Sequence, residues 1–513
     1  MKKHLIHINR SGISVLACTL FFGGLSPLRA QTIDDLLRYS MLNPSGSARF
    51  TAMGGAFGGL GGNFSALTVN PAGLGLYSRN EISLSGSVTS GNGRADYYGE
   101  THRDQELKVN LPQAGFVWIP LDFPDDPSGF KRLQLSIGVN RINDYTGAFY
   151  VSGFNPQSSY MEAVAAENYG ALTTTLNAPG SLAYNAWLIS EENINKGDFR
   201  SLLSGGLNQS KAWYTNGNIS ELNLGFGFNV ADKTYVGFSF NVPFIHYYTH
   251  STLSETVPAG NTAYDNPEHL YFQGYDLDER FSVSGVGFTF KVGAMYQVLP
   301  YMRIGAWLHT PSYYTLSEEY TINLAADLAL PTTEEGDPDG SLTGDLRSKY
   351  SYDIRTPLRA GAALGFIIGQ YGVVDVEGEI VDYTGMKMTI RDDKAYEMQI
   401  NQTVKDQYQV GGVLRVGTEW RAGIGRFRAG YAFNSSPYRD KSVSRTWQNH
   451  TVSAGIGLAF GRWNIDFAVA YHLQKEDYYL YNIVDGNTLA PLVQAANLMQ
   501  NKFVYNLGFS VKF

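Results

Sequence analysis

The chain has 513 residues, with 39 Lys and Arg against 47 Asp and Glu, which gives a formal net charge of −8. This balance, with no long run of Lys or Arg, excludes the basic footprint of a nucleic-acid-binding protein. Glycine (56), tyrosine (34) and phenylalanine (28) are abundant and charged residues make up only 17%, a composition that favours strands over helices.

The first 30 residues have the layout of a secretory signal peptide, which we assign to 1–30. The basic start MKKHLIHINR precedes a mostly apolar stretch, 13–25, and the small residue Ala30 precedes Gln31. Cys18, the only cysteine, is an alternative site for lipid attachment, but the apolar run continues beyond it and favours cleavage after Ala30. No later stretch reaches the roughly 18 apolar residues of a membrane helix, so the exported chain is either soluble or a β-barrel.

Residues 31–80 lack the two-residue alternation of strands. A short helix is predicted over 33–39, and a glycine-rich stretch follows from Ala48 to Asn63. Because glycine permits tight turns and close backbone contacts, we predict that 31–80 forms a hatch packed inside a barrel. A flexible periplasmic tail is the alternative.

Alternating strands are predicted over 81–513. Between Thr451 and Phe460 one face carries large apolar residues, while the other carries Gly, Ser, Thr and Ala. A soluble sandwich would place charges on its second face, whereas small residues suit the interior of a barrel whose apolar face meets lipid. The chain ends on Phe513, in phase with the apolar face, and this ending resembles the terminal signal of outer-membrane barrels.

The sequence predicts an all-β, transmembrane antiparallel barrel of about 14 strands, an even number as bacterial barrels require. The predicted strands are Glu81–Thr89, Lys108–Ile119, Arg132–Val151, Ile219–Val230, Thr234–His250, Phe281–Val298, Met302–Ile322, Tyr350–Ile367, Val373–Met388, Tyr408–Trp420, Arg426–Phe433, Thr451–Phe460, Asn464–Gln474 and Phe503–Phe513.

The predicted connections alternate between short turns and long polar loops, the asymmetry expected of periplasmic turns and outer loops. The second strand fits least well, because Pro112 would remove a ladder hydrogen bond. The long loop from Tyr160 to Leu203 contains two helical-looking pieces, Met161–Ala166 and Ala186–Ile189. They form either an apolar capture groove or simple loop-packing helices.

The run Ala48-Arg49, Met53-Gly54-Gly55-Ala56-Phe57, Ser65-Ala66 and Asn70-Pro71-Ala72-Gly73-Leu74 resembles the N-terminal hatch of the FadL/TodX family of outer-membrane transporters for fatty acids and aromatic hydrocarbons. Weaker echoes are His309-Thr310-Pro311, Thr356 to Gly361, Val381-Asp382-Tyr383 and Arg428 to Tyr431. One departure is Gly62-Asn63, where the family commonly has an acidic pair.

The resemblance implies a monomeric outer-membrane barrel that takes up hydrophobic small molecules and releases them through a lateral opening after the hatch shifts. Outer-membrane lipid and the barrel-assembly machinery are the other expected partners. Asn70 can bond its own turn, Pro71 fixes φ and Gly73 permits an unusual backbone angle. The candidate hatch residues are Gly54, Gly55, Asn70, Pro71, Ala72 and Gly73, and the candidate ligand contacts are Phe57, Phe64, Trp187 and Leu188.

Other functions find less support. No serine-hydrolase, zinc-protease or P-loop motif is present, so we predict no catalytic site, no cofactor and no metal. His246 and His250 share a strand face but suit a membrane interface better than haem or metal. A polar-solute porin would need a charge-lined lumen, whereas a secretion-associated barrel, such as the type IX shuttle, or a haem-related barrel of the same fold stays open.

Overall fold

A computed structural model describes residues 33–123, 129–193, 196–264, 271–328, 341–439, 447–481, 483 and 492–513. The predicted signal peptide lies outside these residues. No helix within the described ranges is long and apolar enough to cross a membrane.

The strands form one closed antiparallel barrel of 14 strands, as predicted. The barrel closes because β1 pairs with β2 on one side and with β20 on the other. Four of the 14 barrel strands are each broken into two segments with separate labels: β3/β4, β10/β11, β12/β13 and β14/β15. The strands are β1 (Glu81–Tyr97), β2 (Glu100–Asp122), β3 (Phe130–Asp144), β4 (Gly147–Asn155), β7 (Leu207–Val230), β8 (Thr234–Thr256), β9 (Phe272–Leu299), β10 (Met302–His309), β11 (Tyr313–Leu328), β12 (Ser341–Arg355), β13 (Arg359–Ile368), β14 (Gly372–Asp382), β15 (Lys387–Thr389), β16 (Val410–Ala422), β17 (Gly425–Asn434), β18 (Gln448–Phe460), β19 (Trp463–Tyr478) and β20 (Ala496–Lys512).

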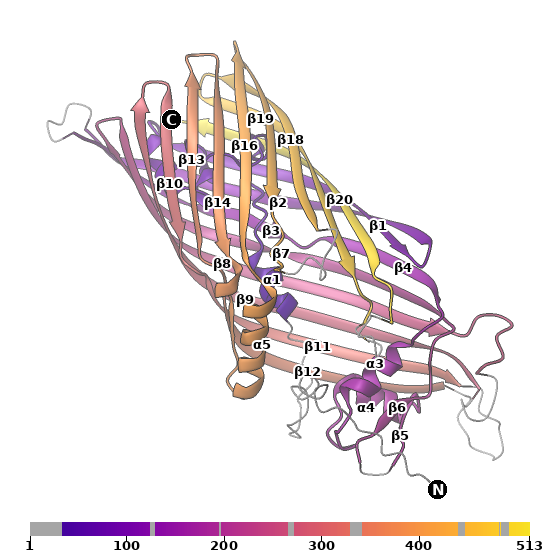
Figure 1. Cartoon of the computed structure of the whole chain (residues 1–513). Coiled ribbons are helices and arrows are strands. Elements are labelled where there is room, and N and C mark those ends of the chain that lie inside the picture. Colours follow the sequence, from indigo (N-terminus) through magenta and orange to yellow (C-terminus); the bar gives the residue numbers. More distant parts are fainter. Residues whose placement is uncertain are drawn as a thin grey trace, which may run out of the picture.

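The two ends of the barrel differ. The turn end carries short hairpins such as 231–233 and 461–462, together with the start of β1 and the end of β20. The loop end carries the long connections, where α3, α4 and a small hairpin gather (Figure 1). The elements that do not form part of the barrel wall are α1 (Ile33–Ser40), α2 (Ala48–Ala52), η2 (Phe64–Thr68), η3 (Pro71–Leu76), α3 (Tyr160–Glu167), α4 (Ala178–Asn185), β5 (Ile189–Glu191), β6 (Phe199–Ser201), η5 (Tyr383–Gly385) and α5 (Lys394–Gln407).

The outward face of the turn half is a belt of exposed apolar side chains. On β9, Val286, Phe288 and Phe290 point outward with exposed fractions of 47%, 54% and 42%. Aromatic side chains border the belt near the turns, among them Tyr301, Tyr371, Trp420 and Trp463. Aromatic girdles on an apolar band are the signature of a barrel that spans a membrane, which confirms the predicted outward placement of the apolar rows here.

In the loop half the apolar side chains point inward and the polar side chains point outward. On β9, Phe281 and Val283 point inward and are buried, while Ser282 and Ser284 point outward. The prediction that every apolar row meets lipid is therefore wrong for the loop half, because these strands extend beyond the belt and their outer face meets water. The same exchange explains why β1, β9 and β20 are longer than predicted.

The interior of the loop half is consequently apolar. Inward side chains of β8, β9 and β11 pack with residues of α1, α3 and α4 in one continuous buried cluster. Representative members are Leu36 of α1, Tyr247 of β8 and Leu316 of β11. Burial of apolar surface on both sides fixes α1 at the base of this cluster.

The wall has an unpaired boundary between β2 and the interrupted strand β3/β4, which we call the seam. A second unpaired boundary follows β12, of which only Asp353 to Arg355 pair with β15. Strand β2 pairs with β3 only from Gln113 to Asp122, and residues 100–110 of β2 pair only with β1. On the other side β4 pairs only with β7. The sequence analysis identified Pro112 as a weak point of this strand. Pro112 lies where the β2–β3 pairing ends, so its missing N–H removes no hydrogen bond to β3.

Candidate functional site

Residues 33–77, the N-terminal segment, contact strands around most of the barrel. The predicted helix over 33–39 is present as α1. Helix α2 packs on β17 to β20, η2 packs on β2 and β3, and η3 packs on β3, β7, β8 and β9. Nearly every residue from Ala48 to Gly75 is buried.

The paired glycines of this segment have backbone conformations that other residues rarely adopt. The φ angles of Gly54 and Gly55 are 62° and 79°, in the left-handed region that favours glycine. A Cβ on Gly54 would also lie 2.9 Å from the backbone nitrogen of Tyr431 on β17. The pair lets the chain turn directly against the wall.

The turn at Asn70 is bonded as expected. Its Oδ1 accepts from the Ala72 N–H at 3.0 Å, and its Nδ2 donates to the Gly58 carbonyl at 2.8 Å. The expected unusual angle at Gly73 is wrong, since its φ is not positive. Glycine is needed there for space, because a Cβ would lie 2.9 Å from Gly61 Cα.

The two aromatic candidates of the segment are fully packed. Phe57 stacks on Phe50 with 5.7 Å between ring centroids, and the Arg49 guanidinium lies 5.3 Å from the Phe57 ring. Phe64 is buried against the inner faces of Gly115 on β2 and Gly138 on β3. Neither ring lines the two cavities described below.

Trp187 and Leu188 lie apart from the segment, in the long loop at the loop end. Trp187 is half exposed and Leu188 is buried. The first predicted loop helix is present as α3, but Ala186–Ile189 is not helical, because α4 occupies Ala178–Asn185 instead. The structure therefore does not bring these two residues together with Phe57 and Phe64.

Buried charges of the wall hold the segment, and the sequence analysis missed them. Glu377 of β14 accepts from Phe57 N at 3.1 Å and from Gly58 N at 2.7 Å, and it pairs with Arg415 of β16 at 2.8 Å. Acidic residues at alternate positions of β14, Asp375, Glu377 and Glu379, gave a signal for this inward row. The predicted small, nearly uncharged inner face is therefore wrong for β14 and β16.

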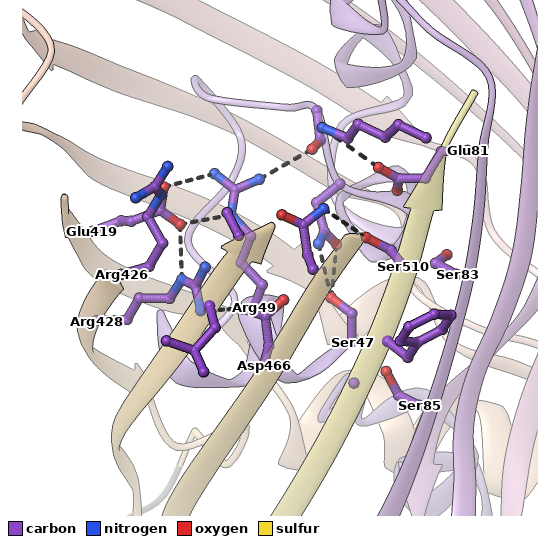
Figure 2. A pocket seen from close by; sticks show the side chains of 18 of the residues that line it. Ser47, Arg49, Glu81, Ser83, Ser85, Glu419, Arg426, Arg428, Asp466 and Ser510 are labelled. Atoms are coloured by element: carbon purple, nitrogen blue, oxygen red, sulfur yellow. Dashed lines mark hydrogen bonds and ion pairs between the residues drawn. The ribbon is translucent and has the colours of Figure 1, made fainter. Parts of the chain in front are cut away.

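A second anchor joins the segment to β16, β17 and β19 (Figure 2). Arg49 and Arg428 of β17 each place Nε 2.7 Å from Glu419 Oε2 of β16, and Arg428 Nη1 lies 2.6 Å from Asp466 Oδ1 of β19. Burial lowers the pKa of Arg49, but the carboxylates of Glu419, Asp466 and Glu81 together raise it by more, so that the pKa lies above its ordinary value. The guanidinium therefore stays charged.

Two cavities flank the segment. Cavity 1, of about 260 Å³, lies beside this anchor near the turn end and has a mostly polar lining that includes Ser83 and Ser85 of β1 (Figure 2). Cavity 2, of about 80 Å³, is bounded by residues 42–45, Phe50 and the glycine pair on one side. Its other boundary consists of inward residues of β1 and β16 to β20, and it reaches the seam at Asn110 of β2 and at Arg141 and Asp144 of β3.

The seam presents apolar side chains to the outside of the wall. Leu107 and Val109 of β2 have exposed fractions of 72% and 77%, the highest of any large apolar side chain in the described ranges. Polar side chains bridge the unpaired edges, as His102 Nε2 lies 2.8 Å from Ser152 Oγ and Lys108 Nζ donates to Thr146 Oγ1 at 3.1 Å. Side chains, rather than backbone hydrogen bonds, close the wall here.

The histidine pair offers no metal centre. His250 bonds Asp278 of the neighbouring strand, and His246 is exposed on the outer face. Over the described residues, no group of three or more His, Cys, Asp or Glu is placed to hold a metal ion.

Comparisons with known proteins place the fold. The chain superposes on the Pseudomonas putida toluene transporter TodX with a TM-score of 0.50 and 15% identity, covering 91% of this chain and 98% of that chain. A Pseudomonas aeruginosa FadL homologue gives a TM-score of 0.52 and 14% identity, with 92% and 100% covered. No family model and no curated protein matches the sequence. At these identities the likeness shows that the chain shares the FadL-type fold.

Proposed function

We propose that this chain is an outer-membrane channel that takes up hydrophobic small molecules, such as long-chain fatty acids or aromatic hydrocarbons, and that the N-terminal segment is its hatch. The single observation that carries the proposal is cavity 2, which is bounded by the segment on one side and borders the seam on the other at Asn110 of β2 and at Arg141 and Asp144 of β3. An interior space thus meets an unpaired, apolar stretch of a membrane-spanning wall. The fold of the toluene transporter TodX supports the same assignment.

The proposed path of the cargo follows the apolar surface inside the barrel. Cargo enters at the loop end and moves through the apolar interior toward Leu36 and Tyr39 of α1. Below α1 the polar anchors at Glu377 and Glu419 hold the segment across the direct route. Exit through the seam passes a hydrophobic molecule to lipid without exposing it to water, which is the favourable direction.

Passage requires the segment to move. Cavity 2 measures about 80 Å³, below the roughly 300–1,000 Å³ of sites that enclose drug-sized ligands. The structure is therefore the closed form of the proposed channel. Movement around Gly54 and Gly55 would enlarge the space beside the seam.

The test is to bridge the seam reversibly. His102→Cys and Ser152→Cys place thiols on its two edges, and a short reducible bis-methanethiosulfonate linker joins them. Uptake of labelled palmitate and toluene by cells that lack other transporters should fall to the level of cells without the protein, and reductant should restore it. Full uptake with the linker verified by mass spectrometry would refute exit through the seam.

The matched control bridges the paired side of the same strand. Asn92→Cys and Gln105→Cys face each other across the β1–β2 ladder, where the strands are already held by hydrogen bonds. The same linker should leave uptake unchanged at this pair. A loss of uptake at both pairs would show that the linker stiffens the barrel in general.

Cargo identity needs a separate measurement. Purification in mild detergent followed by mass spectrometry should recover a hydrophobic small molecule. Recovery of a defined protein complex with no small molecule would instead favour the secretion-associated alternative, and recovery of haem would favour the haem-related one.

A further inference from the structure

The two cavities lie on one face of one strand. Inward positions alternate along β1, and cavity 1 takes Ser83 and Ser85 while cavity 2 takes Ser87 and Thr89. The cavities are therefore neighbours along the inner face of β1. One level of side chains separates them, and two residues of a strand span only about 7 Å.

Asn506 of β20 forms the partition. It lies directly opposite Ser87 in the β1–β20 ladder and is fully buried. Its Nδ2 donates to the Gly46 carbonyl at 2.7 Å and to Thr51 Oγ1 at 3.1 Å. These two bonds join the segment to the wall between the cavities.

Buried polar atoms along this face have no protein partner within the described residues. They include Ser85 Oγ beside cavity 1, Asn110 Oδ1 beside cavity 2 and Asn506 Oδ1 at the partition. Burial of a polar atom without a hydrogen bond is costly, and such groups in proteins are normally satisfied by water. The face is therefore built for hydration.

Positive charge predominates on both sides of the partition. The described lining of cavity 1 includes Arg421, Arg426 and Lys512 besides the anchor arginines, against the carboxylates of Glu81, Glu419 and Asp466. The lining of cavity 2 includes Arg141, Arg415 and Lys502, against the carboxylate of Asp144 in the lining and that of Glu377, which pairs with Arg415. An excess of cations around a hydrated path favours small anions.

We propose that cavities 1 and 2 are two halves of a hydrated, anion-selective passage along the inner face of β1, closed by the contact of Asn506 with Gly46 and Thr51. Its ligands are water and small inorganic anions such as chloride. Cavity 2 borders the seam, but the passage runs from it along β1 toward the turn end, and it does not depend on hydrophobic uptake.

The experiment measures current through the full-length mature protein in planar lipid bilayers under a KCl gradient. Asn506→Ala removes both bonds and should raise the conductance about tenfold over the parent protein, with a reversal potential displaced toward that of chloride. Asn241→Ala is the matched control, because Asn241 is a buried inward asparagine of β8 that bonds only wall residues. It should leave the current unchanged.

Two further variants make the test decisive. Asn506→Leu keeps the approximate side-chain volume, removes the N–H donors and adds no charge, so it should also raise the current if Asn506→Ala fails to fold. Ser87→Cys in the opened background should lose current on reaction with an anionic methanethiosulfonate reagent. Folded Asn506 variants, verified by heat-modifiable migration, that conduct no more than the control, or a cation-selective current, would overturn the passage. Hydrophobic uptake and its dependence on the seam do not enter these readouts.

Discussion

Gly73 and Gly61 touch backbone to backbone, and this contact sets the compactness of the segment. A Cβ on Gly73 would lie 2.9 Å from Gly61 Cα, while Gly62 N donates to the Gly73 carbonyl at 3.0 Å. The loop 58–62 and the turn at Asn70 are thus packed at the minimum separation. Any side chain at position 73 must push one of them away from the wall.

Gly73→Ala is therefore expected to loosen the segment without unfolding the barrel. Overpacking of a tight interior typically costs about 1–3 kcal/mol, and here the cost falls on the contact between 58–62 and the turn. Hydrogen exchange over 54–62 should rise several-fold while the strands keep their protection. Gly86→Ala is the control, because a Cβ there meets nothing within 4 Å, and equal exchange in both variants would contradict the packing role.

For single residues, the sequence predicted the backbone turns of the segment better than it predicted the ion pairs. Asn70, Gly54 and Gly55 belong to a local pattern, so their turns could be predicted from neighbouring residues. Glu377 and Arg415 are paired through the fold, at 2.8 Å across strands β14 and β16, and no local pattern specifies which loop will reach them. The anchoring of the segment could therefore be seen only in three dimensions.

Among elements, β18 shows how position along a strand decides the effect of a charge. Val452, Ile456, Leu458 and Phe460 all point outward, as the alternation predicts. Leu458 lies only three residues from the turn at Gly461, near the edge of the apolar row, whereas Ile456 lies at its centre. The alternation gives the face of a residue but not its depth.

Ile456→Arg should consequently destabilise the barrel by about 2–4 kcal/mol, and Leu458→Arg by about 0–1 kcal/mol, since the cost of arginine on the lipid face falls from the midplane to the interface. Reversible unfolding in lipid vesicles at increasing urea concentration measures both. Equal losses for the two variants would contradict this placement of the belt.

Helices outside the barrel were the least predictable elements. Helix α3 has a capping box at Ser159 and Glu162, a local signal, and it was predicted. Helix α4 starts at Ala178, with Asn177 as its N-cap and Pro179 in its first turn. The apolar residues that follow it, around Trp187, misplaced the prediction by about two turns. Helix α5 has only Ile400 and Val404 buried, too weak an apolar stripe to stand out.

For the whole molecule, the exchange of faces along the strands divides one barrel into two environments. In the turn half apolar residues meet lipid and polar residues meet the segment. In the loop half polar residues meet water and apolar residues enclose the proposed entry path. The number of strands, 14, and the alternation of short and long connections could be predicted from the sequence. The exchange of apolar and polar faces could not, because alternation alone does not show which face of a strand is inside once the strand leaves the membrane.

β9 offers the sharpest measurement of this division, because one uninterrupted outward row crosses it. Positions 280, 282 and 284 are polar, and positions 286, 288, 290 and 292 are apolar. Nitroxide labels on single cysteines of this row, in protein reconstituted in lipid vesicles, should be relaxed by molecular oxygen at Phe288 and Phe290 and by a water-soluble nickel chelate at Ser282 and Ser284. The change should fall between Ser284 and Phe288. Oxygen-dominated relaxation along the entire row would place the loop half in lipid. The apolar interior of the loop half could then not be explained as an entry path for cargo from the surrounding water.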